Sequence, residues 1–490
     1  MQKIAISGLA AVAAVLGGAA VPTVAMAQPM SAAHPVAAAA SGTAEAGPVS
    51  AAALRAAAAE RIVEASKITK AVGRAGLAWR AGVAKAAADS PAPGAPLDSC
   101  VFTVDCLAVE GSANLTGSSA GGPVSAATAA PLVHAARWNG SSWKGVGVAL
   151  PSGTKAADLN GISCKGARSC LVAGDYYTST SDTAASHALA LVYNGTSLKP
   201  APALPLPKGT TDASLSDVSC AMTSYCVAVG VADGNSAAFG ENGELTLLET
   251  WNGAKWTLHT VSETSGSSEL LPTEVACATP AFCALTGEKV TVTGSSSSPT
   301  ISIGLYFASW NGKTLTTMKS VAAASSADFV VPVSVSCATS ANCGVTGLVA
   351  DLSGSSASTA EVGSFTEIWN GSSWKLATTP WPTGTTEAIT LGISCYAAHT
   401  CEAVGADSTA PATAAVQSAD AAAVSYNGTT GTLQTITPPA KGASDEFSSV
   451  SCLPWGTCVA VGFTGKDTAS SPATMTGTWS GKAWELHPGL

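Results

Sequence analysis

The feature that most restricts the fold of this chain is the spacing of its cysteines. All 14 cysteines fall into pairs in which five residues separate the two partners, and the first cysteines recur every 56 to 64 residues. A near-regular period of this length is typical of repeat architectures, in which one supersecondary unit is copied along the chain. The sequence therefore predicts seven copies of one unit. Their pairs are Cys100–Cys106, Cys164–Cys170, Cys220–Cys226, Cys277–Cys283, Cys337–Cys343, Cys395–Cys401 and Cys452–Cys458.

Each copy has the pattern of four β-strands. In the copy from Leu215 to Trp256, the short β-prone runs VSC and CVAVG flank the cysteine turn, and LLETWNGAKW reads as two runs joined by Asn-Gly, a strong hairpin signal. An aromatic residue stands before this turn in every copy, and in four copies a second tryptophan follows it. The first aromatics are Trp138, Tyr193, Trp251, Trp310, Trp369, Tyr426 and Trp479, and the second tryptophans are Trp143, Trp256, Trp374 and Trp484. Recurrence of the second tryptophan at one offset from the turn predicts a role in packing between copies.

Seven four-stranded units arranged around an axis form a β-propeller, which leaves few exposed sheet edges. The main alternative, a solenoid, needs terminal copies with a polar outer face, and here the first and seventh copies resemble the others. The sequence therefore favours an all-β, seven-bladed propeller over residues 98–490. It leaves open whether a strand is exchanged between the first and last blades to close the ring.

Residues 98–490 resemble the secreted bacterial seven-bladed propellers of the kelch and galactose-oxidase-like superfamily. The resemblance rests on an apolar strand followed by one that ends in glycine, as at Gly230, Gly405 and Gly462, and on an aromatic strand that turns into one carrying Trp. It implies the fold and no activity. The copper ligands of galactose oxidase have no counterpart, and the Asn-Gly-x-x-Trp turn lacks the aspartate of the similar sialidase Asp-box.

The amino terminus has the pattern of a secretory signal peptide. Lys3 precedes an apolar run to about Ala20, and Ala25-Met26-Ala27 offers a small-residue cleavage site. The apolar run is too short to span a membrane. We therefore expect a secreted protein, extracellular or associated with the cell surface. The predicted segments are a signal peptide (1–27), a disordered Ala/Pro/Gly/Ser-rich stretch (28–50), an amphipathic Ala-rich helix (51–90), a Pro-rich linker (91–97) and the propeller (98–490).

The cysteine pairs predict structural disulfides. A zinc site needs four ligands, whereas each pair supplies two, and a histidine, His399, lies near only one pair. Positions six apart can face each other across a hairpin turn, and disulfides persist in exported proteins.

Charge and composition exclude several functions. The propeller carries 15 Lys and Arg against 28 Asp and Glu, so no basic surface is expected for nucleic acid. Its only arginines are Arg137 and Arg168, too few for the arginine triad of sialidases. No serine elbow, metal-binding His/Glu cluster or phosphate-cradling loop occurs.

The distances between the cysteines and the aromatic residues indicate which face of the propeller carries loops of variable length. From each first aromatic to the next cysteine the distance is 26 or 27 residues, whereas from the second cysteine to the aromatic it ranges from 21 to 32. Variation therefore concentrates in the connection between the second and third strands. In an antiparallel blade this connection emerges on the same face as the links between blades, opposite both tight turns. Long loops on a rigid scaffold often bind ligands, so this face is the candidate functional face.

Two groups of residues fall on that face. In six copies an acidic residue stands six to nine positions before the first cysteine, which predicts a loose ring at the channel mouth whose oxygen ligands would suit calcium. The alternative is that these acids are solvated or cap turns. The second group is predicted to lie in a loop of the second blade, where its tyrosines could stack on a sugar ring and its carboxylate could hydrogen-bond the sugar hydroxyls. The alternative is that one of the tyrosines packs inward. The first group is Asp158, Asp212, Glu269, Asp328, Glu387 and Asp445, and the second is Asp175, Tyr176 and Tyr177.

Three functions remain from the sequence. The first is a secreted, monomeric, non-catalytic protein that binds an extracellular polysaccharide, wall component or protein through this face. The second is an extracellular polysaccharide hydrolase or lyase with paired carboxylates near the channel mouth. The third is a structural surface protein. The low share of charged residues, 11%, and the Ser/Thr/Gly-rich loops favour a surface protein over an enzyme.

Overall fold

A computed structural model describes most of the repeat region. The described residues are 96–102, 105–111, 133–179, 184–234, 244–259, 261, 268–295, 298–318, 329–351, 361–385, 387–408, 419–436, 443–466 and 473–488. The predicted signal peptide, the 28–50 segment, the 51–90 helix and most of the 91–97 linker lie outside them. Across the described ranges, no helix is long and apolar enough to cross a membrane.

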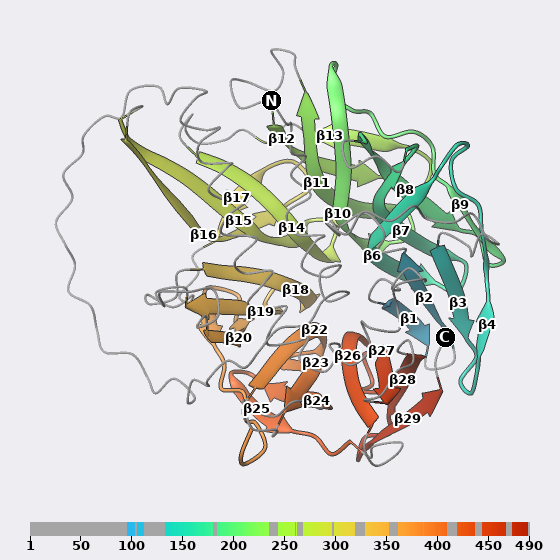
Figure 1. Cartoon of the computed structure of the whole chain (residues 1–490), viewed down its shortest axis with the longest axis vertical. Coiled ribbons are helices and arrows are strands. Elements are labelled where there is room, and N and C mark those ends of the chain that lie inside the picture. Colours follow the sequence, from blue (N-terminus) through green and yellow to red (C-terminus); the bar gives the residue numbers. More distant parts are fainter. Residues whose placement is uncertain are drawn as a thin grey trace.

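Seven β-sheets are arranged in a ring around a central axis (Figure 1). Blade 1 contains β1 (Leu97–Phe102), β2 (Asp105–Gly111), β3 (Val133–Trp138) and β4 (Trp143–Gly145). Blade 2 contains β6 (Ala156–Gly166), β7 (Ser169–Tyr177), β8 (Ser186–Tyr193) and β9 (Ser197–Pro200), joined by β5 (Gly147–Val148). Blade 3 contains β10 (Thr210–Met222), β11 (Tyr225–Gly234), β12 (Glu244–Trp251) and β13 (Trp256–His259). Blade 4 contains β14 (Ser268–Thr279), β15 (Phe282–Ser295), β16 (Ser298–Trp310) and β17 (Leu315–Thr317).

Blade 5 contains β18 (Phe329–Thr339), β19 (Asn342–Asp351), β20 (Glu361–Trp369) and β21 (Trp374–Leu376). Blade 6 contains β22 (Glu387–Ala397), β23 (Thr400–Ser408), β24 (Asp420–Asn427) and β25 (Thr430–Leu433). Blade 7 contains β26 (Ala443–Cys452), β27 (Cys458–Lys466), β28 (Ala473–Trp479) and β29 (Trp484–Pro488). The four main strands of each blade are antiparallel neighbours in sequence order, which confirms the predicted seven-bladed propeller.

The segment that leaves the fourth strand of a blade can extend onto the next blade. After β4, the short strand β5 pairs in parallel with β9, the outer strand of blade 2. Single parallel bridges, Thr378 with Thr430 and Ile436 with Trp484, repeat this arrangement from blade 5 to 6 and from blade 6 to 7. These contacts cover outer sheet edges that would otherwise present unpaired backbone groups.

The hydrophobic core lies between the blades. Trp374 and Trp484 are fully buried, and Trp256 is 5% exposed. The Trp374 ring lies 4.9 Å from that of Phe307 in blade 4, centroid to centroid, so it packs across a blade junction. Three of the four second tryptophans are therefore core residues, whereas Trp143 is half-buried and donates a hydrogen bond to Thr476 Oγ1 of blade 7 (2.6 Å).

A β-bulge recurs four residues before the first cysteine in blades 2 to 7, and it explains the single glycine of each second strand. A Cβ atom at Gly230 would stand 2.1 Å from the Ser214 carbonyl oxygen, far inside van der Waals contact. β1 begins after this position and so lacks this bulge, and Glu110 takes the place of the glycine. The bulge residues are Asn160, Ser216, Thr273, Val333, Leu391 and Ser448, and the glycines are Gly174, Gly230, Gly287, Gly347, Gly405 and Gly462.

All seven predicted disulfides are present, and no cysteine is free. Each joins directly opposed residues of the first two strands, as Cys220 opposes Cys226. The Asn-Gly turns have the predicted positive φ at glycine, for example +97° at Gly140. There the Asn139 side-chain oxygen accepts hydrogen bonds from the backbone N–H groups of Ser141 and Ser142, so the asparagine stabilises the turn.

A row of serine hydroxyls connects neighbouring inner strands. In six blades the residue before the first cysteine is serine, and its Oγ accepts a hydrogen bond of 2.9 Å from the N–H of the first cysteine in the next blade. In blade 4 the corresponding residue is Ala276. The six serines are Ser99, Ser163, Ser219, Ser336, Ser394 and Ser451. We call them the serine row.

The ring closes without exchanging a strand. Blade 7 and blade 1 each contain only strands of their own copy, and the serine row continues across their junction through Ser451 and the Cys100 N–H. Two further bonds reinforce it: the Asp98 N–H donates to Ser449 Oγ (3.3 Å), and Ser448 Oγ donates to the Pro96 carbonyl (2.7 Å). The closing junction thus has the serine contact found at five other junctions, together with these two bonds.

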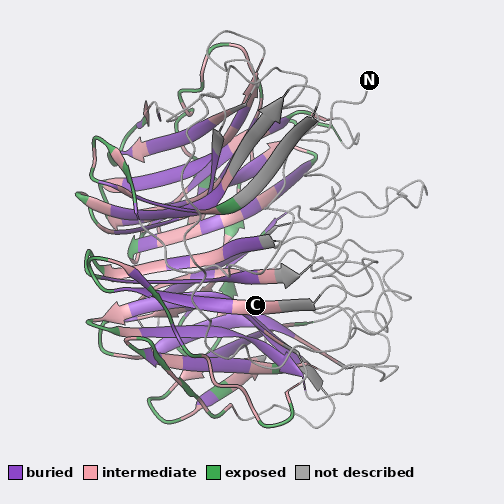
Figure 2. Ribbon diagram, turned by 90° about the vertical axis from the view of Figure 1, so that its left-hand side faces the viewer, coloured by how far each residue is buried: buried purple, intermediate pink, exposed green. Residues whose placement is uncertain are grey.

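The two ends of the strands form different faces. Exposed turns gather on one face, at the left of Figure 2, and the second face lies at the opposite ends of the strands. We call the first the turn face; it carries the cysteine and Asn-Gly turns. The second we call the connection face; it carries the links between blades and the connections between second and third strands, represented by residues such as Asp158, Asp175 and Asp445.

Candidate functional site

The segment Asp175–Tyr177 lies at the end of strand β7, not in a loop as the sequence predicted. Tyr176 opposes His187 and Tyr177 opposes Ser186 on β8, so the strand continues further than its residues suggested. Alternate side chains of a strand point to opposite faces. Tyr176 therefore packs with the hydrophobic core between blades 1 and 2 and stacks on His187, with ring centroids 5.0 Å apart. The two tyrosines do not form one platform, and Tyr177 is buried (9% exposed).

Two acidic residues oppose each other at the same end of blade 2. Asp158 on β6 is the direct cross-strand partner of Asp175 on β7, so both side chains lie on one face of the sheet. Asn160 Nδ2 donates to Asp175 Oδ1 (3.2 Å) and to the Leu215 carbonyl of blade 3 (2.9 Å). The face of the blade 2 sheet that carries the two carboxyl groups is therefore directed toward blade 3.

Burial makes these carboxyl groups weak acids. Desolvation raises the pKa of Asp158 to about 7, and the charge of Asp175 raises it further in the same direction. Desolvation also raises the pKa of Asp175 to about 6, although hydrogen bonds from Tyr177 and Asn160 favour its ionised form. Both carboxyl groups therefore hold a proton to a higher pH than exposed aspartates do.

Asp212 extends this group from blade 3. Its Oδ1 accepts a hydrogen bond of 3.2 Å from the N–H of Ser186, the residue opposite Tyr177. The structure thus brings together four of the predicted residues with one that the sequence did not single out. We call the group the junction site; it consists of Asp158, Asn160, Asp175, Tyr177 and Asp212.

The other predicted acids do not extend the group into a described ring. Asp445 lies on β26 in blade 7 and is 3% exposed, so it is a buried residue and not a solvated one at the channel mouth. Glu269 and Glu387 belong to β14 and β22, but their side chains are outside the described part of the structure, as is the whole of Asp328. Within the described ranges, no three or more His, Cys, Asp and Glu side chains are placed to hold a metal. Calcium binding remains a prediction.

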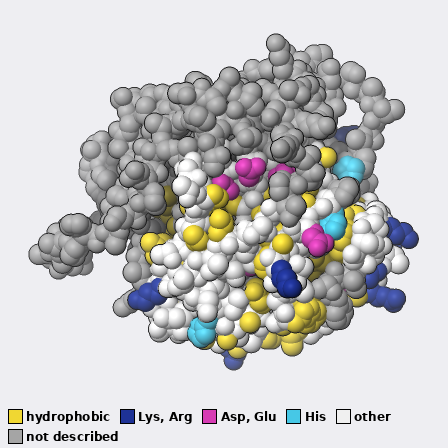
Figure 3. All heavy atoms as spheres, turned by 90° about the horizontal axis from the view of Figure 1, so that it is seen from below, with side chains coloured by type: hydrophobic (Ala, Val, Ile, Leu, Met, Phe, Trp, Pro, Cys, Tyr) yellow, Lys and Arg dark blue, Asp and Glu magenta, His cyan; other side chains and the backbone are white. Residues whose placement is uncertain are grey.

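Asp445 has acidic neighbours in blade 6. Asp407 and Asp420 oppose each other on β23 and β24, and the Asp445 N–H donates to the Ala419 carbonyl (2.9 Å). Burial raises the pKa of Asp407 to about 6, with a contribution from the charge of Asp420. Figure 3, which views the molecule from below, shows acidic side chains close to one another on this side of the molecule. Acidic residues therefore occur on the connection face at two separate places.

The sequence did not indicate a further acidic pair on the inner strands. Asp217 of blade 3 and Glu274 of blade 4 both stand three residues before the first cysteine, where other blades have Gly, Ser or Leu. The Asp217 carboxylate accepts hydrogen bonds from the N–H groups of Val218 (2.7 Å) and Val275 (2.9 Å). Burial raises the pKa of Asp217 to about 7, and burial followed by the charge of Asp217 raises that of Glu274 well above its ordinary value. Comparing equivalent positions of the copies would have revealed this pair.

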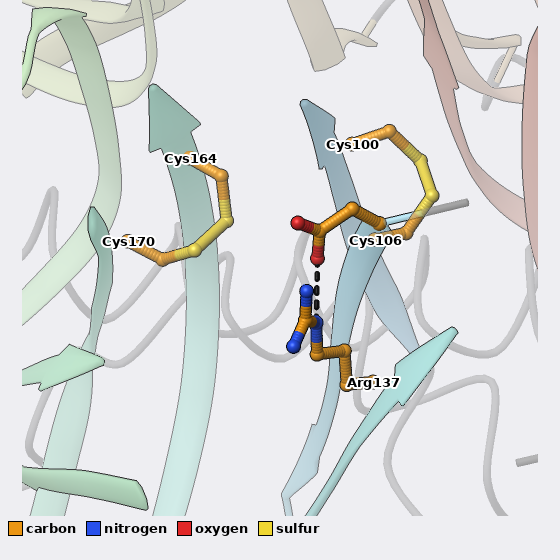
Figure 4. A network of polar contacts seen from close by, with 6 residues as sticks. Cys100, Cys106, Arg137, Cys164 and Cys170 are labelled. Carbon is orange, nitrogen blue, oxygen red and sulfur yellow. Dashed lines mark hydrogen bonds and ion pairs between the residues drawn. A yellow bond between two sulfur atoms is a disulfide. The ribbon is translucent and has the colours of Figure 1, made fainter. Parts of the chain in front are cut away.

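The turn face carries an ion pair. Arg137 Nε donates to Asp105 Oδ1 at 2.6 Å, beside the disulfides of blades 1 and 2 (Figure 4). Arg137 also donates to the Tyr193 hydroxyl. One of the two propeller arginines is therefore neutralised by its own chain.

Comparison with known proteins finds distant similarity to solved structures. No protein-family model and no curated protein matches the chain. Among solved structures, a polysaccharide lyase of family PL25, an ulvan lyase, is similar with a TM-score of 0.47 and 9% identity, covering 81% of this chain and 96% of that one. Ycf48 bound to a D1 peptide has a TM-score of 0.40 and 11% identity, covering 76% and 91%. YjhT has a TM-score of 0.37 and 12% identity, covering 70% and 98%.

The disulfides indicate the compartment. Seven disulfides and no free cysteine suit an oxidising environment, extracellular or periplasmic, because cytosolic reductants would keep the thiols reduced. The disulfides thus agree with the predicted export from the cytoplasm, but they do not distinguish an extracellular from a periplasmic location.

Proposed function

We propose that this protein is a secreted, non-catalytic binding protein that uses its connection face to hold a hydroxyl-rich extracellular ligand, most simply a polysaccharide or wall glycan. The observation that carries the proposal is the junction site, where two carboxyl groups, a carboxamide and a phenol converge between blades 2 and 3. Such groups donate to and accept from sugar hydroxyls, and each is held in place by strand pairing. Tyr176 and His187 would add an aromatic edge on the other side of β7.

The chemistry of the site favours a neutral ligand. Burial raises the pKa values of Asp158 and Asp175, so a protonated carboxyl group of this pair can donate to a hydroxyl oxygen. The propeller is acidic overall, which disfavours an anionic ligand.

The test is retention of the full chain on insoluble polysaccharides and bacterial walls, with calcium and with a chelator. Asp158→Asn and Tyr177→Phe, which remove one ionisable group and one hydroxyl, should each weaken retention several-fold. Asp420→Asn, an exposed acid on the same face in blade 6, is the matched control and should bind normally. Normal retention of both Asp158→Asn and Tyr177→Phe would refute the junction site as the place where the ligand binds. Retention that depends on calcium would instead support the predicted acidic ring.

A second candidate function is a polysaccharide hydrolase or lyase. It is favoured by the same carboxyl pair, because a carboxylic acid that stays protonated near neutral pH can serve as a general acid. Release of reducing or unsaturated sugar ends by the purified protein, abolished by Asp158→Asn, would establish it. Saturable retention without turnover would support the binding protein. Absence of both would leave the structural surface protein.

A further inference from the structure

Trp455 differs from every other described tryptophan. Its side chain is 59% exposed, whereas Trp138, Trp374 and Trp484 are at most 1% exposed. It lies between Cys452 and Cys458, in the cysteine turn of blade 7, and so on the turn face rather than the connection face. An exposed indole loses free energy to hydration unless a ligand covers it.

The turn that carries Trp455 is held rigid. The Cys452–Cys458 disulfide closes it, the Leu453 N–H donates to the Thr457 carbonyl (2.9 Å), and the Gly456 N–H donates to the Leu453 carbonyl (2.8 Å). Gly456 takes a φ of +87°, which a residue with a side chain rarely adopts. The side chain of Leu453 anchors the turn, because it is only 4% exposed. The backbone that carries the indole is therefore held in one conformation, which lowers the entropy lost on binding.

A neighbouring blade supports the turn. A Cβ atom on Gly456 would be 3.6 Å from Cε2 of Tyr396, which lies in the cysteine turn of blade 6. The Tyr396 hydroxyl is itself hydrogen-bonded to Ser425, so its ring is fixed. The turn that carries Trp455 thus packs, at Gly456, against an aromatic ring of a different disulfide-closed turn.

The two cysteine turns at this blade junction carry no charge. The cysteine turns of blades 6 and 7, residues 396–400 and 453–457, contain no Lys, Arg, Asp or Glu. They do contain polar side chains, among them His399, which is exposed and has a φ of +63°, the one positive φ of a non-glycine residue among those described. The exposed indole therefore belongs to a pair of turns that offer hydrogen-bonding groups without charge.

From these observations we infer that Trp455 is a stacking platform for a single ring of a neutral glycan, on the face opposite the junction site. A sugar ring presents one apolar face to the indole and its hydroxyls to the polar edge. A stable protein partner would need roughly 1,000 Å² of buried surface, far more than one ring and its edge provide. Anionic polymers are disfavoured by the acidic propeller, which offers no cation in these turns.

The test uses the full chain and three uncharged oligosaccharides: cellohexaose, laminarihexaose and chitohexaose. Titration is followed by calorimetry and by tryptophan fluorescence, since burial of an exposed indole shifts its emission to the blue. We expect binding of at least one sugar at or below ~10 mM, the range of a single weak contact. Trp455→Ala should weaken it at least tenfold and abolish the shift, and Trp455→Phe should retain part of the affinity.

The matched control is Met222→Ala. Met222 is 47% exposed on the corresponding cysteine turn of blade 3, and its loss should leave affinity unchanged. Binding that survives Trp455→Ala, or the absence of binding by all three sugars, overturns the inference. Full binding by Trp455→Leu also overturns it, because the site would then be a general apolar contact of the kind a protein partner uses. Asp158→Asn should not affect this binding, which separates the two faces.

Discussion

The gap in the serine row at blade 4 offers a direct test of how the blades are held together. At six junctions a serine Oγ accepts the N–H of the next blade's first cysteine at 2.9 Å, including the closing junction. At the junction from blade 4 to blade 5, Ala276 stands in the serine's place, opposite the Cys337 N–H. Since the inner strands follow one geometry, Ala276→Ser should place a hydroxyl at hydrogen-bonding distance from this N–H.

The expected stabilisation follows from the bonds at the other junctions. A net contribution of about 1 kcal/mol is typical for an intramolecular hydrogen bond of ordinary length. The reverse change, Ser219→Ala, leaves the Cys277 N–H without its acceptor and should cost ~1–2 kcal/mol for the same reason. In a ring of about 390 residues, 1 kcal/mol corresponds to a shift of roughly 1 °C in the midpoint of thermal unfolding.

Differential scanning calorimetry of the wild-type protein and both variants measures this directly, with the disulfides kept oxidised. Ala276→Ser should raise the midpoint and Ser219→Ala should lower it, so the two variants differ by ~2–3 °C. An unchanged midpoint for Ser219→Ala would show that the serine row contributes nothing to stability. If only Ala276→Ser failed, the geometry at the fourth junction would differ from that of the other six.

Three further predictions concern stability. Burial raises the pKa of Asp98, at the closing junction, to about 7; because this folded-state pKa exceeds the unfolded one, its ionisation destabilises the ring as pH rises from about 4 to 7. Asp98→Asn should therefore raise the denaturation midpoint at pH 7 and leave it nearly unchanged at pH 4, and equal effects at both pH values would contradict this. Gly230→Ala should destabilise the folded protein by more than ~3 kcal/mol, because the new Cβ would lie 2.1 Å from a backbone oxygen. The control Gly304→Ala has open space around the new Cβ and should change the free energy of unfolding by under ~1 kcal/mol. Denaturant titrations measure both values. Replacing Cys277 and Cys283 together by alanine should cost about 2 kcal/mol from the short closed loop, and a midpoint that did not fall would show that the disulfide adds no constraint.

Comparison of the sequence with the structure shows that features within one copy were predictable. The four strands, the Asn-Gly turns and the opposed cysteines all depend on residues within about 45 positions of one another, and hairpin pairing follows from their order. The glycine of each second strand was visible as well. Its cause, the bulge opposite it, was not, because a bulge depends on how two strands pair.

The candidate site was only partly predictable. Asp158, Asp175 and Asp212 were identified, but their convergence depends on contacts between blades 2 and 3. Tyr176 and Tyr177 were placed in a loop because Ser and Thr follow them, whereas pairing with β8 extends the strand and separates their rings. Trp455 was missed because nothing in its local sequence distinguishes an exposed tryptophan from a buried one.

The sequence by itself determined the number of blades, their strand order and their disulfides, since each is encoded by spacing and turn residues repeated seven times. Only the tertiary structure decided which residues of different copies meet. The serine row, the closing junction, the Asp217–Glu274 pair and the junction site all join residues of different blades. Such contacts depend on the angle and distance at which one sheet packs on the next, and these are set by the buried side chains between them rather than by any local pattern.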